Sequence, residues 1–129
     1  MGPESSASAQ ADQSALIVGA DPATLRLCRG VLEGSGFEVG AVESGMEAVV
    51  AARQRPPVLI FVASQLRDVP GREAVLWLRS NPALRATPVI LLATYAEEDK
   101  DSGGGGPGVL LRKPFSAADI RKAIVDLLG

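Results

Sequence analysis

Histidine is absent from this 129-residue sequence, and Cys28 is its only cysteine. A single cysteine excludes an internal disulfide, and without histidine most of the nitrogen and sulfur ligands that zinc prefers are missing. No apolar run approaches the ~20 residues of a membrane span, and the first residues lack the apolar stretch of a secretory signal. These absences predict a cytoplasmic protein in a reducing environment, without membrane contact.

An excess of basic charge is also missing. The chain has 13 Lys and Arg against 15 Asp and Glu, for a net charge of −2 and a pI of about 5.1. The basic residues are scattered, so the electrostatic footprint of a protein that binds nucleic acid is absent. With 47% hydrophobic residues, the chain has the size and composition of one domain with a real core.

A polar segment precedes the first apolar run. Residues 1–14 are mainly Ser, Ala and Gln and offer no apolar anchor, which predicts a flexible tail. The folded domain is expected to cover residues 15–129.

The segment at 57–63, PVLIFVA, is the centre of the predicted fold. It is continuously apolar, which is typical of a strand buried on both faces of a sheet. Four further segments are predicted as strands, at 15–18, 37–42, 88–93 and 109–111. Amphipathic segments predict helices at about 22–33, 44–53, 72–80 and 117–128.

Strands that alternate with helices indicate an α/β fold with a parallel sheet covered on both faces. In the second helix, the pattern predicts that Met46, Val49 and Val50 face inward. The third helix carries the apolar residues Val75, Leu76 and Leu78. A helix expected between the last two strands is predicted to be short or missing, because glycines at 103–106 disfavour it.

Four local features carry a resemblance to a known family. They are the Asp21-Pro22 turn after the first strand, the loop that closes on Gly71, the PVILL strand, and Lys113-Pro114-Phe115. From about residue 15 to 128 the chain resembles the receiver domain of two-component response regulators, the CheY-like family. The resemblance implies a flavodoxin-like, doubly wound five-stranded sheet in the order 2-1-3-4-5.

In that family an Asp after the third strand accepts a phosphoryl group, two acids after the first strand hold Mg²⁺, and a hydroxyl and a Lys contact the phosphoryl group. Counted along this sequence, the acidic pair falls on Gly19 and Ala20, the acceptor on Ala63 and the hydroxyl on Ala93. A shift of one residue would restore the hydroxyl as Thr94. Lys113 and Pro114 match the family. We therefore predict a degenerate pocket, with no catalytic residue, metal or cofactor.

The remaining polar residues have simpler interpretations. Asp21 is expected to cap a helix, and Asp68 to be a turn residue. Lys113 is interpreted as a surface cation, or else as a residue that binds an anion, and the family implies a cis bond before Pro114. Cys28 is predicted to lie in the core and Trp77 to be partly buried.

The resemblance also implies a face through which partners bind. The aromatic position on the fifth strand falls on Leu110, and the candidate interaction face is Tyr95, Leu110, Arg112 and Phe115. The leading hypothesis is a phosphorylation-independent, non-enzymatic module that binds an unknown regulator or output domain, or itself. The alternatives are a sensor of small anions or nucleotides, and a conventional phospho-acceptor that uses an unexpected acid such as Asp68.

Overall fold

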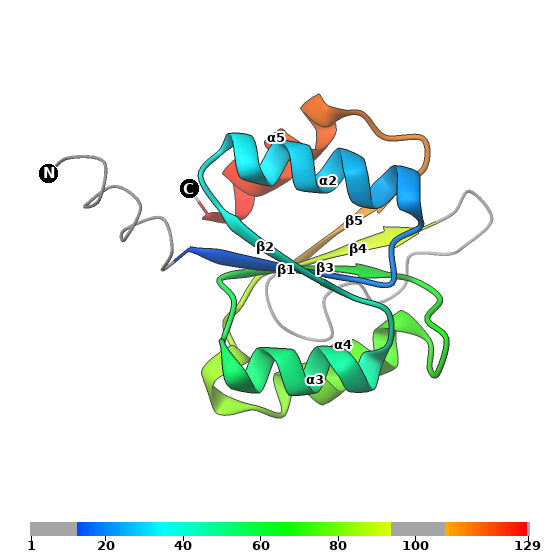
Figure 1. Ribbon diagram of the computed structural model, residues 1–129, viewed down its shortest axis with the longest axis vertical. Helices are drawn as coiled ribbons and strands as arrows, with labels where there is room; N and C mark the ends of the chain where they lie inside the picture. The colour runs from blue at the N-terminus through cyan, green and yellow to red at the C-terminus, as the bar shows by residue number, and fades with distance from the viewer. Residues whose placement is uncertain (1–12, 94–107, 129) are drawn as a thin grey trace, which may run out of the picture.

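The computed structural model describes residues 13–93 and 108–128. Five parallel strands form one sheet in the order β2-β1-β3-β4-β5, as predicted. The strands are β1 (Ser14–Val18), β2 (Glu38–Val42), β3 (Leu59–Ala63), β4 (Val89–Ala93) and β5 (Gly108–Arg112). β3 lies in the middle of the sheet (Figure 1), where the sequence places it.

Helices cover both faces of the sheet (Figure 1). One layer consists of α2 (Pro22–Gly34) and α5 (Ala117–Leu128). The other consists of α3 (Gly45–Gln54) and α4 (Gly71–Arg79), followed by a 3₁₀ turn, η1 (Pro82–Leu84). The segment in which the sequence predicts a short or missing helix, between the last two strands, falls in residues 94–107, outside the described residues. None of the described helices is long and apolar enough to cross a membrane.

The core is divided by the sheet into two clusters. Leu59 and Phe61 of β3 face the cluster that contains Cys28 of α2 and Ile120 of α5, which we call the α2/α5 core. Ile60 of β3 faces the opposite cluster, the α3/α4 core, with Ala48, Val75 and Leu84 among its buried members. Residues of β3 alternate between the two cores, which is why the whole strand is apolar.

The predicted inward face of α3 is partly wrong, and one apolar residue of α4 is also exposed. Met46 and Val50 of α3 are 57% and 47% exposed, and Leu76 of α4 is 55% exposed. Small residues of α3 are buried instead, namely Gly45, Ala48 and Ala52. They allow close approach: a Cβ on Gly45 would lie within 3.0 to 3.2 Å of Val69, Ala74 and Trp77.

The strand boundaries shift by one or two residues from those expected. β1 begins at Ser14, one residue before the expected start of the domain, and Ser14 is buried. β3 begins only at Leu59, and Val58 just ahead of it is 36% exposed. Cys28 is fully buried and Trp77 is partly buried, and both predictions are therefore confirmed.

Candidate functional site

A shallow pocket of about 170 Å³ lies at the carboxyl ends of the central strands. Such ends are where ligands bind in open α/β sheets. The structure brings six of the residues that the sequence assigned to the degenerate pocket together here: Gly19, Ala20, Asp21, Ala63, Ala93 and Lys113. Pro114 follows as an exposed residue, and Thr94 lies outside the described residues.

The register of the sheet explains this convergence. Val18 pairs with Val62, and Ala63 pairs with Leu92. Parallel strands in this register end side by side, so the residues that follow them meet. Ala63 and Ala93 therefore lie where the sequence count put the acceptor and the hydroxyl of the family.

Among the described residues, Asp21 is the one acidic residue that lines the pocket. Its Oδ2 accepts a hydrogen bond of 3.2 Å from the N–H of Thr24, as expected for the N-cap of α2. Its Oδ1 accepts a hydrogen bond of 2.9 Å from Lys113 Nζ. These two hydrogen bonds hold the pKa of Asp21 well below its usual range, and the bond from Thr24 has the larger effect.

Lys113 is positioned by the end of the sheet. Its backbone N–H donates to the carbonyl of Ala93 at 3.0 Å, and its peptide bond to Pro114 is cis, as the resemblance implies. Because its ammonium group pairs with Asp21, Lys113 does not present an unpaired positive charge to the pocket.

An apolar side chain fills the space beside Gly19. This glycine has φ +75°, a conformation that side chains with a Cβ rarely adopt, and a Cβ built on it would lie 2.2 Å from Leu66 Cδ2. Ala63 Cβ would be 3.5 Å away. Position 19 therefore lies next to the acceptor position, but Leu66 occupies the space that a side chain there would need.

The pocket residues do not fit the magnesium site of the family. Mg²⁺ takes several oxygen ligands in octahedral geometry. Within residues 13–93 and 108–128, no group of three or more acidic, His or Cys side chains lies together. Both oxygens of Asp21 are also engaged, by Thr24 and by Lys113.

Asp68 has a role that the sequence did not reveal. Its Oδ1 accepts from the N–H of Gly45 at 2.9 Å, and its Oδ2 accepts from the N–H of Met46 at 3.1 Å. Ser44 Oγ accepts from the next N–H, that of Glu47, at 3.1 Å. The first three N–H groups of α3 therefore all have an acceptor. The two hydrogen bonds to Asp68, chiefly that from Gly45, lower the pKa of its carboxyl group.

The candidate interaction face is not gathered on one surface. Leu110 packs against the α3/α4 core, whereas Phe115 packs against the α2/α5 core on the other side of the sheet. Arg112 is exposed at the end of β5, and Tyr95 lies outside the described residues.

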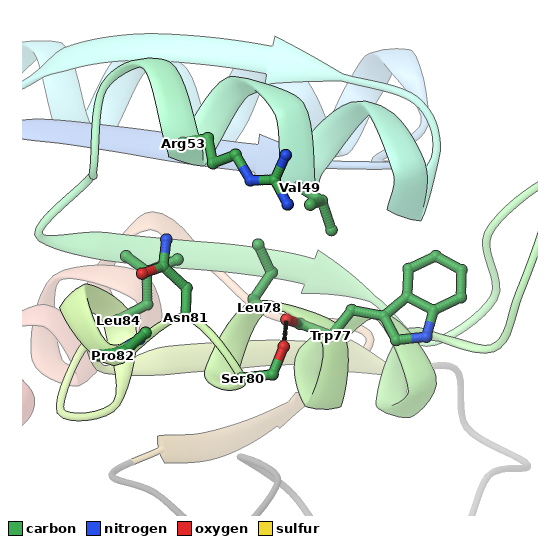
Figure 2. Close-up of a pocket in the computed structure, with 8 residues that line it drawn as sticks. All are labelled: Val49, Arg53, Trp77, Leu78, Ser80, Asn81, Pro82 and Leu84. Atoms are coloured by element: carbon green, nitrogen blue, oxygen red, sulfur yellow. Dashed lines mark hydrogen bonds between the residues drawn. The ribbon is translucent and has the colours of Figure 1, made fainter.

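Sequence reasoning missed a second hollow, between α3 and the segment from α4 to η1. It measures about 330 Å³ and is lined by Val49, Arg53, Trp77, Leu78, Ser80, Asn81, Pro82 and Leu84 (Figure 2). The only signal in the sequence is the spacing of Val49 and Arg53, four positions apart on one face of the predicted helix.

The chain matches the family model described as the response regulator receiver domain over residues 15–125. It is 33% identical to the polar-differentiation response regulator DivK of Brucella ovis, over 91% of this chain and 97% of that protein. DivK of Brucella anthropi is 32% identical over the same shares.

Solved structures agree in fold. A putative response regulator from Chloroflexus aurantiacus superposes with a TM-score of 0.80 at 24% identity, over 90% of this chain and 97% of that chain. The receiver domain of the sensor histidine kinase PA1611 from Pseudomonas aeruginosa, which holds a magnesium ion in its active site cleft, gives a TM-score of 0.79 at 24% identity, over 91% and 98%.

Proposed function

The chain belongs to the response regulator receiver family of two-component signalling, and from this premise we propose that it acts without phosphorylation, as a constitutive protein-interaction module. Receiver domains are signalling modules that bind other proteins, such as kinases or output domains. The partner of this one is proposed to recognise a single, unmodified state.

The composition of the pocket is the observation that carries this proposal. A phosphoryl acceptor has to be nucleophilic, and a divalent ion has to neutralise the incoming charge. Ala63 offers a methyl group, Gly19 and Ala20 offer no carboxylate, and Asp21 is already paired with Lys113. Among the residues that the structure describes, the pocket therefore offers neither an unpaired carboxylate as acceptor nor a set of acidic ligands for the ion.

Asp68 is a poor substitute acceptor. Its two carboxylate oxygens cap α3, and a phosphoryl group on either of them would displace the N–H of Gly45 or Met46. The proposal therefore also excludes the conventional mechanism with a shifted acid.

Acetyl phosphate with Mg²⁺ gives the direct test. We expect the intact mass to stay unchanged under conditions in which a receiver domain that retains the acceptor Asp, mixed in the same tube, gains one phosphoryl group. Stoichiometric modification of this chain would overturn the proposal, and peptide mapping would then show whether Asp68 is the acceptor. As a second readout, beryllofluoride with Mg²⁺ is expected to leave the amide NMR spectrum unchanged around Asp21 and Lys113.

Sensing of a small anion or nucleotide is the second candidate. The pocket is small, about 170 Å³, and an anion would have to compete with Asp21 for Lys113. A thermal-shift screen with phosphate, nucleotides and cyclic dinucleotides distinguishes the two functions, because a ligand that binds the folded state raises the melting temperature. The docking proposal predicts no response.

A further inference from the structure

The hollow between α3 and the α4–η1 segment, which we call the α3/α4 groove, has the properties of a docking site. Val49, Trp77 and Leu84 supply apolar walls (Figure 2). Met46 and Val50 of α3 and Leu76 of α4 do not line the groove, but they are further apolar side chains of the same two helices and are 57%, 47% and 55% exposed. Exposed apolar patches, unlike single exposed apolar residues, usually mark an interaction surface.

The polar residues of the groove are donors. Arg53 lies over the apolar wall and, within residues 13–93 and 108–128, has neither a salt bridge nor a hydrogen-bonded side-chain acceptor. Asn81 uses its Oδ1 to accept from the N–H of Ala83 at 3.0 Å, which leaves its amide donors unengaged by any described residue. Figure 2 shows both side chains at the opening between α3 and η1.

The charge of the groove is opposite to that of the chain. None of the described residues that line it is acidic, whereas the chain as a whole has a net charge of −2. An apolar groove with a guanidinium and amide donors at its opening is complementary to carboxylates held beside apolar side chains, since Arg binds carboxylates in a bidentate fork.

We propose that the α3/α4 groove binds an acidic amphipathic helix of a partner protein. A third helix can pack along two neighbouring ones, with its apolar residues against Val49 and Trp77 and a carboxylate on Arg53. The inference rests on the proposed function, because it supplies the surface and the partner chemistry that a constitutive docking module needs. It also assigns the partner to the outer surface of α3 and α4, and not to the end of β5 where Arg112 is exposed.

Selection from random peptides tests the partner chemistry, because the groove itself then chooses the sequence. The probe is a phage-displayed library of peptides of about 16 residues in a helix-favouring frame, long enough to form several turns. Selection on the full chain is expected to enrich peptides with Asp or Glu spaced three or four positions from Leu, Phe or Ile. Binding of a selected peptide should also change the fluorescence of Trp77, the only tryptophan in the chain.

Three variants make the test specific. Arg53→Glu should weaken a selected peptide by about tenfold or more, a loss of about 1.4 kcal/mol, and should favour a copy of the peptide in which Lys replaces the acids. The affinity of Arg53→Gln for the selected peptide should lie between those of the wild type and Arg53→Glu. Arg121→Glu, an exposed change on α5, is the matched control and should leave affinity unchanged.

Several results would overturn the inference. They are a failure to enrich any peptide, enrichment without acidic residues, and equal binding by the wild type and Arg53→Glu. The occupant would instead be a second copy if sedimentation showed a dimer that Val50→Asp dissociates. The phosphorylation test is separate: a chain that accepts a phosphoryl group but still selects acidic helices contradicts only the proposed function, and an unmodified chain that selects none contradicts only the groove.

Discussion

Lys113 Nζ donates a hydrogen bond of 2.9 Å to Asp21 Oδ1, although the two residues are 92 positions apart in the chain. The bond joins the turn after β1 to the loop after β5, so a cation that the family uses for phosphate chemistry here neutralises a helix cap. The pair supports the proposal that Asp21 and Lys113 have a structural role in this pocket.

The first prediction concerns the pH dependence that this pair creates. Because the folded-state pKa of Asp21 is depressed, its stabilising effect is complete above the unfolded pKa of about 3.9 and is lost as the pH falls toward the folded pKa. The measurement is the difference in unfolding free energy between about pH 6 and about pH 3. This difference should be smaller in Asp21→Asn than in the wild type, because the amide does not titrate.

The magnitude should be modest, since the Asp21 side chain is 46% exposed and solvent screens the pair. At neutral pH we expect Asp21→Ala to cost about 1 kcal/mol through the lost cap, and Asp21→Asn to cost less because an amide oxygen also caps. Asp126→Asn, which breaks an exposed pair with Lys122, is the control and should have little effect. A cost as small as that of the control would contradict the role given to Asp21.

The second prediction concerns the cap that Asp68 places on α3. Asp68→Ala should lower the melting temperature and speed amide hydrogen exchange at Gly45 and Met46, because both N–H groups lose their acceptors. In Asp68→Asn, the melting temperature and the exchange rates of these two amides should lie between those of the wild type and Asp68→Ala. Since the pKa of Asp68 is lowered, protection of these two amides should decline only in acid. Unchanged exchange in Asp68→Ala would show that the cap is not formed in solution.

The third prediction compares two glycines. Gly19→Ala should destabilise the domain by about 1–2 kcal/mol or more, because φ is positive and Leu66 blocks the new methyl group. Gly30→Ala should stabilise it by about 0.5–1 kcal/mol, since Gly30 lies inside α2 with no atom near the new Cβ. Chemical denaturation measures both.

Leu66→Ala separates the two causes of the Gly19 effect. In the Leu66→Ala background, Gly19→Ala should still lower the unfolding free energy through the positive φ, but no longer through the contact with Leu66. A Gly19→Ala cost that is the same in both backgrounds would mean that Leu66 does not restrict this corner.

The fourth prediction concerns Arg79, whose Nη1 donates to the carbonyls of Leu84, Arg85 and Thr87 at 3.2, 3.0 and 2.8 Å. These bonds hold the connection from α4 to β4. Arg79→Gln should cost about 1–3 kcal/mol in unfolding free energy, because carbonyls lose a charged donor. Arg85→Gln changes an exposed neighbour and serves as the control. Equal losses of unfolding free energy in the two variants would contradict the stabilising role given to the hydrogen bonds of Arg79.

The strands of the sheet and their order could be predicted from the sequence. Continuous apolar segments such as Leu59–Ala63 have few alternatives to a buried parallel strand, and their alternation with helices determines the order of layers. Counting from motifs also located the pocket, because positions such as Ala63 and Ala93 are set by the strand ends.

Side-chain roles that depend on distant partners could not be predicted. Met46 and Val50 were assigned to the core on periodicity, but Gly45 and Ala48 let α3 approach so closely that small residues fill its inner face. Asp68 was interpreted as a turn residue because the N–H groups that it caps lie more than 20 positions earlier in the chain.

The packing of Leu66 beside Gly19 sets the cost of the first step on any mutational route toward an acidic pocket. A carboxylate introduced first at position 19 meets a left-handed backbone and a contact with Leu66, and it brings no metal site while Ala20 and Ala63 stay neutral. Movement or replacement of Leu66 relieves the contact, but the cost of the positive φ remains. A single reversion at this corner therefore lowers stability before it brings any new chemistry.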